Sequence, residues 1–102
     1  PTSANQEDYN SMGSVGALRL TDLVRNTERI VAIELLCAAQ ALEFAKFEPG
    51  RGVQAAYALV RSTVPPLEED RPLSHDIEKI REMIADGSLV RAAQKASRFR
   101  HA

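Results

Sequence analysis

A long stretch with no helix-breaking residue in its interior dominates this chain. Between residues 11 and 47 there is no proline, and the glycines are confined to positions 13 and 16 near the start. Leucine, alanine, glutamate, arginine and isoleucine dominate the rest, a composition that favours the α-helix. The pattern predicts one helix over residues 11–47, which would be more than about 50 Å long at the usual rise per residue.

The second half of this helix is apolar on nearly every side. From Ile30 to Ala45 the only polar residues are Glu34, Gln40 and Glu43. Such a helix must be surrounded by protein or lipid. A membrane span needs about 20 apolar residues, and Glu34 interrupts the run. We therefore expect a central helix that neighbouring helices cover, and the remaining residues are too few to supply them all. The chain is predicted to be part of a larger subunit, of an oligomer, or of both.

Turn residues divide the remainder of the chain. Residues 48–52 should end the long helix. A second helix is predicted over residues 53–63, and the two prolines at positions 65 and 66 should stop it. A charged connector follows over residues 67–73 and contains Arg71. We interpret Arg71 as a partner in a structural ion pair rather than as a clamp for a substrate carboxylate.

Two further helices are expected after the connector. Ser74 should cap the third helix, and Gly87 should end it. Ser88 should cap a last helix that continues to about Phe99. Together with the absence of any strand pattern, these signals predict an all-α fold in which a long central helix and shorter helices over residues 53–102 form part of a multi-helix bundle.

Composition argues against several classes of protein. The net charge of −1 gives no general attraction to nucleic acid or to a membrane surface. Cys37 is the only cysteine, so no internal disulfide can form, and its apolar surroundings predict a small buried side chain. His75 and His101 are too far apart for a metal site, so none is predicted. Nothing resembles a signal peptide, and we expect a cytoplasmic protein.

Polar and ionisable side chains are concentrated ahead of the long helix. Residues 1–10 lack periodicity and are predicted to be an extended opening segment that carries the adjacent carboxylates of Glu7 and Asp8, with Asn5 and Gln6 beside them. Acidic residues favour the start of a helix because its first amides carry partial positive charge. A carboxylate there can equally contact a substrate amine or move a proton. Composition does not choose between these two interpretations.

The segment Pro-Thr-Ser-Ala-Asn-Gln-Glu-Asp-Tyr-Asn-Ser-Met-Gly, residues 1–13, resembles the aromatic amino acid ammonia-lyases. The resemblance continues through residues 26–28 and 32–42, and it returns at residues 64–73 and 76–78. It therefore covers nearly the whole chain, which corresponds to the C-terminal part of a much longer subunit. Within the family, the lyases that act on histidine are the most similar.

The resemblance implies an all-α homotetramer whose long central helices are bundled across subunits. It also implies a methylidene-imidazolone electrophile, formed from an internal Ala-Ser-Gly triplet, that removes ammonia from an α-amino acid to give an α,β-unsaturated acid. Glu7 matches a glutamate that, in the lyases acting on histidine, faces the substrate amine and imidazole. Gln6 is expected to support Glu7 in this contact. Lyases of the phenylalanine and tyrosine type tend to carry glutamine there, so Glu7 favours histidine as substrate and urocanate as product.

The alternatives concern both substrate and role. Tyr9 and Asn10 depart from the residues usual in the family, which leaves a phenylalanine- or tyrosine-type lyase or an aminomutase open. A non-catalytic helical oligomerisation module is the other alternative. The chain holds no Ala-Ser-Gly triplet, because Ala96 and Ser97 are followed by Arg98. The electrophile and most substrate contacts must therefore lie elsewhere, and we expect the isolated chain to be inactive.

Overall fold

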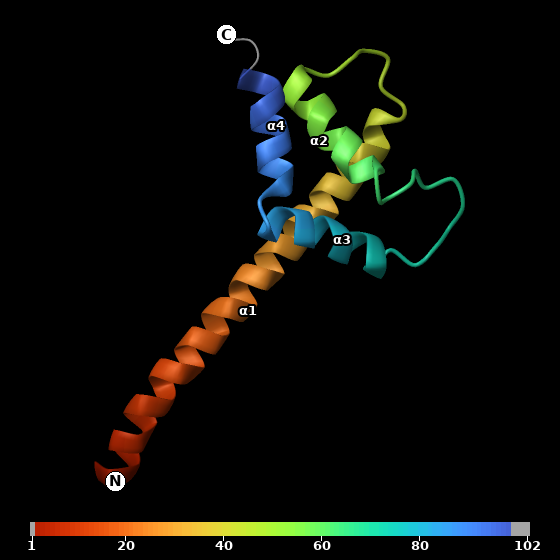
Figure 1. Ribbon diagram of the computed structural model, residues 1–102. Coiled ribbons are helices and arrows are strands. Elements are labelled where there is room, and N and C mark those ends of the chain that lie inside the picture. Colours follow the sequence, from red (N-terminus) through yellow and green to blue (C-terminus); the bar gives the residue numbers. More distant parts are fainter. Residues whose placement is uncertain (1, 99–102) are drawn as a thin grey trace.

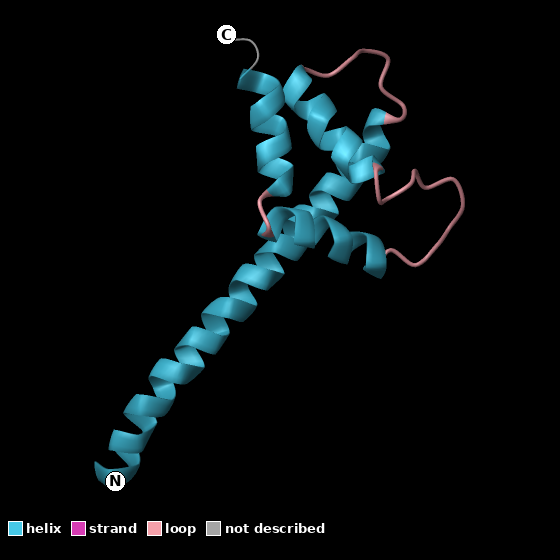
Figure 2. Cartoon of the chain, viewed as in Figure 1, coloured by secondary structure: helices cyan, strands magenta, loops and turns pink. Residues whose placement is uncertain are grey.

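The structure is a computed structural model that describes residues 2–98, with side chains described from residue 14 onward. Loops connect four helices, and residues 2–98 contain no strand (Figure 2). The helices are α1 Thr2–Leu42, α2 Arg51–Arg61, α3 Ser74–Ala85 and α4 Ser88–Arg98. The predicted all-α fold class is therefore confirmed.

The helix α1 is a single rod whose bounds differ from those expected (Figure 1). The extended opening segment predicted over residues 1–10 is wrong for residues 2–10, because no proline or glycine interrupts the helix there and α1 begins at Thr2. The helix also ends at Leu42 rather than at residue 47. Beyond it the N–H groups of residues 43–45 bond to carbonyls three residues earlier, at N–O distances of 3.1, 3.1 and 3.2 Å. This tightened turn ends the α-helical geometry.

The helix α2 begins two residues before its predicted start and ends at Arg61 rather than at residue 63. The expectation that Ser74 caps α3 is wrong. Ser74 is already helical, Leu73 precedes it, and no side-chain hydrogen bond caps this end. The N-terminal amides of α3 therefore rely on groups other than a serine hydroxyl.

The junction between α3 and α4 is a sharp turn. Gly87 has φ of +78°, a left-handed conformation that glycine adopts without steric cost, as expected for the residue that ends α3. Ser88 is the first residue of α4, and its backbone N–H donates to the carboxylate of Asp86 at 2.8 Å. Asp86 thus satisfies an amide at the start of α4, the function expected of Ser88. The predicted end of this helix at Phe99 lies outside the described residues.

The core is small and aliphatic, as the scarcity of aromatic residues suggested. It lies where α3 packs against α1 and α2 packs against α4. Two alanines of α1 are among its buried side chains, and their small size allows neighbouring elements to approach the rod closely. The buried apolar residues are Ala32, Ala39, Val60, Val64, Ile80 and Leu89.

The chain is far from compact. Its radius of gyration is 19.3 Å, whereas a compact domain of this length would have about 13 Å. The three short helices gather around the C-terminal part of α1, and the N-terminal part of the rod projects away from them (Figure 1). Every residue from 14 to 27 is exposed.

Large apolar side chains are consequently exposed along α1 and just beyond it. Leu18 is 66% exposed and Phe44 is 77% exposed, which is unusual for residues of this size. The prediction that Cys37 is buried is wrong, because the short helices cover other faces of α1 and Cys37 is exposed. Along the described part of the chain, no helix is both long enough and apolar enough to cross a membrane.

Candidate functional site

The predicted site residues Gln6 and Glu7 lie near the N-terminal end of α1. Their backbone is helical, whereas their side chains lie outside the described residues. At about 1.5 Å per residue, Glu7 is about 31 Å along the helix axis from Glu28, where α1 first meets the short helices. Any pocket that includes Glu7 must therefore be built largely from residues other than those of α2, α3 and α4.

Arg71, the predicted partner in a structural ion pair, makes structural contacts within the chain. Its Nε lies 3.0 Å from Oδ2 of Asp76, which is buried. Its two terminal nitrogens donate to the carbonyl oxygens of Pro66 at 3.1 Å and of Pro65 at 2.7 Å. All three guanidinium nitrogens are engaged within the chain, and the interpretation of Arg71 as part of a structural ion pair is confirmed.

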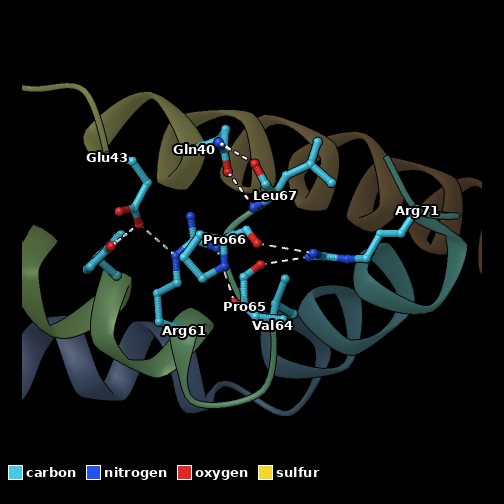
Figure 3. A network of polar contacts seen from close by, with 9 residues as sticks. Gln40, Glu43, Arg61, Val64, Pro65, Pro66, Leu67 and Arg71 are labelled. Atoms are coloured by element: carbon cyan, nitrogen blue, oxygen red, sulfur yellow. Dashed lines mark hydrogen bonds and ion pairs between the residues drawn. The ribbon is translucent and has the colours of Figure 1, made fainter. Parts of the chain in front are cut away.

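A polar network around residues 64–67 was not anticipated from the sequence. The side-chain amide of Gln40 accepts a hydrogen bond from the Leu67 N–H at 2.9 Å and donates to the Leu67 carbonyl at 3.2 Å (Figure 3). Arg61 donates to the Val64 carbonyl at 3.1 Å. With the two bonds from Arg71, each carbonyl of residues 64–67 accepts a side-chain hydrogen bond. The only available signal was a lone glutamine within an apolar helical run.

Glu43 links the end of α1 to α2. The hydroxyl of Tyr57 donates to Oε1 of Glu43, and Nε of Arg61 donates to the same oxygen at 3.0 Å. The guanidinium of Arg61 also lies over the Tyr57 ring, 5.3 Å from its centre, at cation–π range. The Tyr57 hydrogen bond, more than the nearby Arg61, lowers the pKa of the Glu43 carboxyl below its ordinary value. Glu43 is therefore a structural anion at neutral pH.

The described residues enclose two notable hollows. One, of about 250 Å³, lies between α1 and the connector and is lined mainly by apolar side chains together with Cys37, Gln40 and Arg71. The other, of about 740 Å³, is an open groove between α2 and α4 lined by three alanines together with Arg51, Gln54 and Lys95. Across the described residues no group of three His, Cys, Asp or Glu side chains could hold a metal ion. His75 is exposed, and His101 lies outside that part of the chain.

The model of one protein family, the aromatic amino acid lyases, matches residues 1–62. This chain belongs to that family. The match includes Gln6, Glu7 and the whole of α1, so both predicted site residues lie within the segment that the family shares. No solved structure matches the chain.

Among curated proteins, the chain is similar to several that are named histidine ammonia-lyase. The protein from Deinococcus radiodurans is 51% identical over 96 residues, which cover 94% of this chain and 18% of the relative. The protein from Natranaerobius thermophilus is 49% identical over 96 residues, 93% of this chain and 19% of the relative. The protein from Gloeobacter violaceus is 50% identical over 97 residues, 94% of this chain and 19% of the relative. The chain thus spans about a fifth of the length of these relatives.

Proposed function

We propose that this chain is the C-terminal segment of an ammonia-lyase subunit that converts histidine to urocanate. The observation that carries the proposal is the identity of about one half with histidine ammonia-lyases over more than nine-tenths of the chain. The three relatives with this level of identity carry the same name, so they support one particular activity as well as membership of the family. It favours histidine over the phenylalanine- and tyrosine-type substrates and over an aminomutase reaction.

In this proposal Glu7 contacts the amino group or imidazole of the substrate, or handles its proton, and Gln6 assists. A carboxylate pairs favourably with an amine or an imidazole, whereas it gains nothing from an apolar ring. A positioned acid–base group contributes at least about a hundredfold in many enzymes. The role of Glu7 is supported by its place in the matched segment, residues 1–62.

The methylidene-imidazolone group of the family does not fit the residues of this chain. Its formation requires an Ala-Ser-Gly triplet, and here Ala96 and Ser97 are followed by Arg98. These three residues lie in the regular last turns of α4. The group must therefore come from another part of the subunit, and the residues of this chain contribute binding and proton handling to a site completed elsewhere.

The partners that this proposal requires are the remainder of the same subunit and further copies in a homotetramer. Their support is the exposed apolar surface of α1, because patches of this kind mark protein–protein contact sites. The same surface favours the second candidate function, a non-catalytic helical module that drives oligomerisation. The two candidates differ in whether the N-terminal end of α1 contributes a reacting group.

A chimera tests the proposed activity. The segment of the Deinococcus radiodurans enzyme that matches this chain is replaced by the 102 residues, and urocanate formation from histidine is measured. We expect activity within about tenfold of the parent enzyme, with phenylalanine and tyrosine turned over far more slowly. A folded, tetrameric chimera without urocanate formation would contradict the proposal and would favour the oligomerisation module.

A further inference from the structure

Helical geometry determines which residues share a face of the chain with Glu7. Because α1 begins at Thr2, Glu7 lies within a regular helix rather than in an extended segment. In an extended segment, residues two positions apart lie on the same side. In an α-helix the neighbours are three and four positions apart, with about 5–6 Å between their Cβ atoms. The helix therefore places Asn5 and Tyr9 on nearly the opposite side from Glu7.

The residues three and four positions from Glu7 carry no charge. They are Ser3, Ala4, Asn10 and Ser11. No lysine, arginine or histidine occurs between residues 1 and 18, so α1 offers Glu7 no cation in the neighbouring turns. Asn10 is the only one of the four with an amide side chain, and an amide NH₂ group is a donor that a carboxylate accepts. The backbone of α1 thus places one amide residue beside Glu7.

The serine hydroxyl on this face has another acceptor. Hydroxyl groups within a helix often donate to the backbone carbonyl four residues earlier. In α1 both Thr21 and Thr27 do so, at 3.0 and 2.8 Å. For Ser11 the corresponding acceptor is the backbone carbonyl of Glu7 rather than its carboxylate. An asparagine amide has no such preference inside a helix, so Asn10 is the better donor for the carboxylate.

Side chains three positions apart bond to one another elsewhere in this protein. In α1, Asn26 accepts from Nη1 of Arg29 through its Oδ1 at 3.2 Å. In α3, Arg81 donates from Nε to Oε1 of Glu78 at 2.7 Å, although it also reaches Glu28 of α1 at 3.2 Å. A pair at this spacing needs no neighbour from another element. The placement of Asn10 beside Glu7 therefore persists when the rest of the subunit surrounds α1.

A glutamate that acts on a substrate must be held in one orientation. Its side chain loses considerable rotamer freedom when it is fixed, and catalytic groups must stay within about 0.5 Å of their productive position. A hydrogen bond from a neutral donor favours the charged form of a carboxylate and restricts its orientation. A donor one turn away on the same helix meets this need without occupying the substrate side of the site.

We infer that Asn10 is a positioning residue for Glu7: α1 places it three positions further along the same face, where its amide holds the carboxylate in the orientation that the substrate amine or imidazole requires. The inference rests on the proposed function of Glu7. Asn10 departs from the residue usual in the family, so this arrangement is a feature of the present chain.

The kinetic test compares variants of the complete subunit. Asn10→Leu removes the amide at similar size, and leucine favours a helix more than asparagine does. We expect kcat to fall at least about fivefold with KM within about twofold, since a misoriented Glu7 impairs the reaction more than binding. Asn5→Leu, the same change on the opposite side of the helix, should leave kcat within about twofold. Equal losses in the two variants would overturn the inference.

Two further variants test whether Asn10 acts through Glu7. In the Glu7→Gln background, Asn10→Leu should change kcat by less than about twofold, because the group that it positions is gone. Asn10→Asp keeps the shape of the side chain but puts a second negative charge beside Glu7, so it should lower kcat at least as much as Asn10→Leu. Additive losses in the first case, or wild-type kcat in the second, would overturn the inference.

A structural readout separates this inference from the proposed function. In a crystal structure of the complete wild-type subunit, we expect Nδ2 of Asn10 within about 3.2 Å of a carboxylate oxygen of Glu7. A longer separation would overturn the inference whatever the kinetics. Full turnover by Glu7→Gln would instead refute the proposed role of Glu7, and the distance would still decide whether Asn10 holds its carboxylate.

Discussion

The side chain of Gln40 binds both backbone groups of Leu67, a residue 27 positions later in the chain. The amide oxygen accepts from the Leu67 N–H and the amide nitrogen donates to the Leu67 carbonyl, so one side chain replaces the pairing that a strand partner would provide. Pro65 and Pro66 lack N–H groups, so they contribute only their carbonyl groups, which accept hydrogen bonds from Arg71. The loop is therefore held on α1 by a residue of α1.

Replacing Gln40 by Ala should release this loop. Two hydrogen bonds of about 1 kcal/mol each amount to about 2 kcal/mol of local stability, or about thirtyfold faster hydrogen exchange at the Leu67 amide. The measurement is hydrogen–deuterium exchange of the complete subunit. Gln54→Ala is the control, because Gln54 is exposed and makes one hydrogen bond to the Pro49 carbonyl at 2.7 Å. Equal exchange in the two variants would contradict the assigned role of Gln40.

Replacing Asp76 by Asn should loosen the connector. The change keeps the shape of the side chain but leaves Arg71 without its buried counter-charge. Because Arg71 is partly exposed, we expect a loss of about 1–2 kcal/mol rather than the larger cost of a fully buried pair. A protease specific for glutamate should then cleave after Glu69 about tenfold faster. Asp22→Asn, which removes an exposed aspartate from α1, should leave the cleavage rate unchanged.

The contact between Glu43 and α2 should weaken in acid. The folded state lowers the pKa of Glu43, so its contribution to stability is complete above the unfolded value of about 4.3 and is lost as the pH falls through the lower folded value. The thermal midpoint of the wild type should therefore fall more between pH 6 and pH 3.5 than that of Glu43→Gln. The variant will still lose some stability, because the pKa values of Glu78 and Asp86 are lowered as well. An identical acid loss in both proteins would show that Glu43 does not contribute.

Local sequence signals predicted much of the fold. The proline-free run, the turn residues at 48–52 and the paired prolines at 65–66 located α1 and α2. Gly87 ended α3 as expected, and α4 follows it. The bounds of α1 were less predictable. A polar segment such as residues 2–10 has no breaker to stop a helix that is already formed, although its composition alone does not favour one.

Long-range contacts were not predictable from local patterns. Nothing in the sequence near Gln40 indicates Leu67 as its partner, and nothing near Arg81 indicates Glu28. Such pairs depend on how helices pack in three dimensions. Cys37 illustrates the same limit, because the apolar run around it does not reveal which face of α1 its neighbours cover. Glu7 was singled out by resemblance, and its role stays a prediction.

Replacing Glu7 by Gln tests that role directly. In the complete subunit we expect turnover of histidine to fall at least about tenfold, because glutamine is similar in size but can neither carry the charge nor accept a proton. Asp8→Asn is the matched control, since it removes the neighbouring carboxylate and should have a smaller effect. Steady-state kinetics with histidine provide the measurement. Unchanged kcat and KM in Glu7→Gln would remove Glu7 from the site.

The isolated chain should neither turn over histidine nor persist as a compact monomer. It lacks the triplet that forms the electrophile, and α1 exposes large apolar side chains such as Leu23 and Ile30 to water. Exposed surface of this kind drives association. Light scattering should therefore detect aggregates of the chain alone, or a defined species only when the missing part of the subunit is present.

A well-defined, folded oligomer of the 102 residues alone would favour the oligomerisation module. Urocanate formation by the purified chain would contradict the expectation that the electrophile lies in another part of the subunit. A soluble monomer with its apolar residues covered would contradict the need for neighbours around α1.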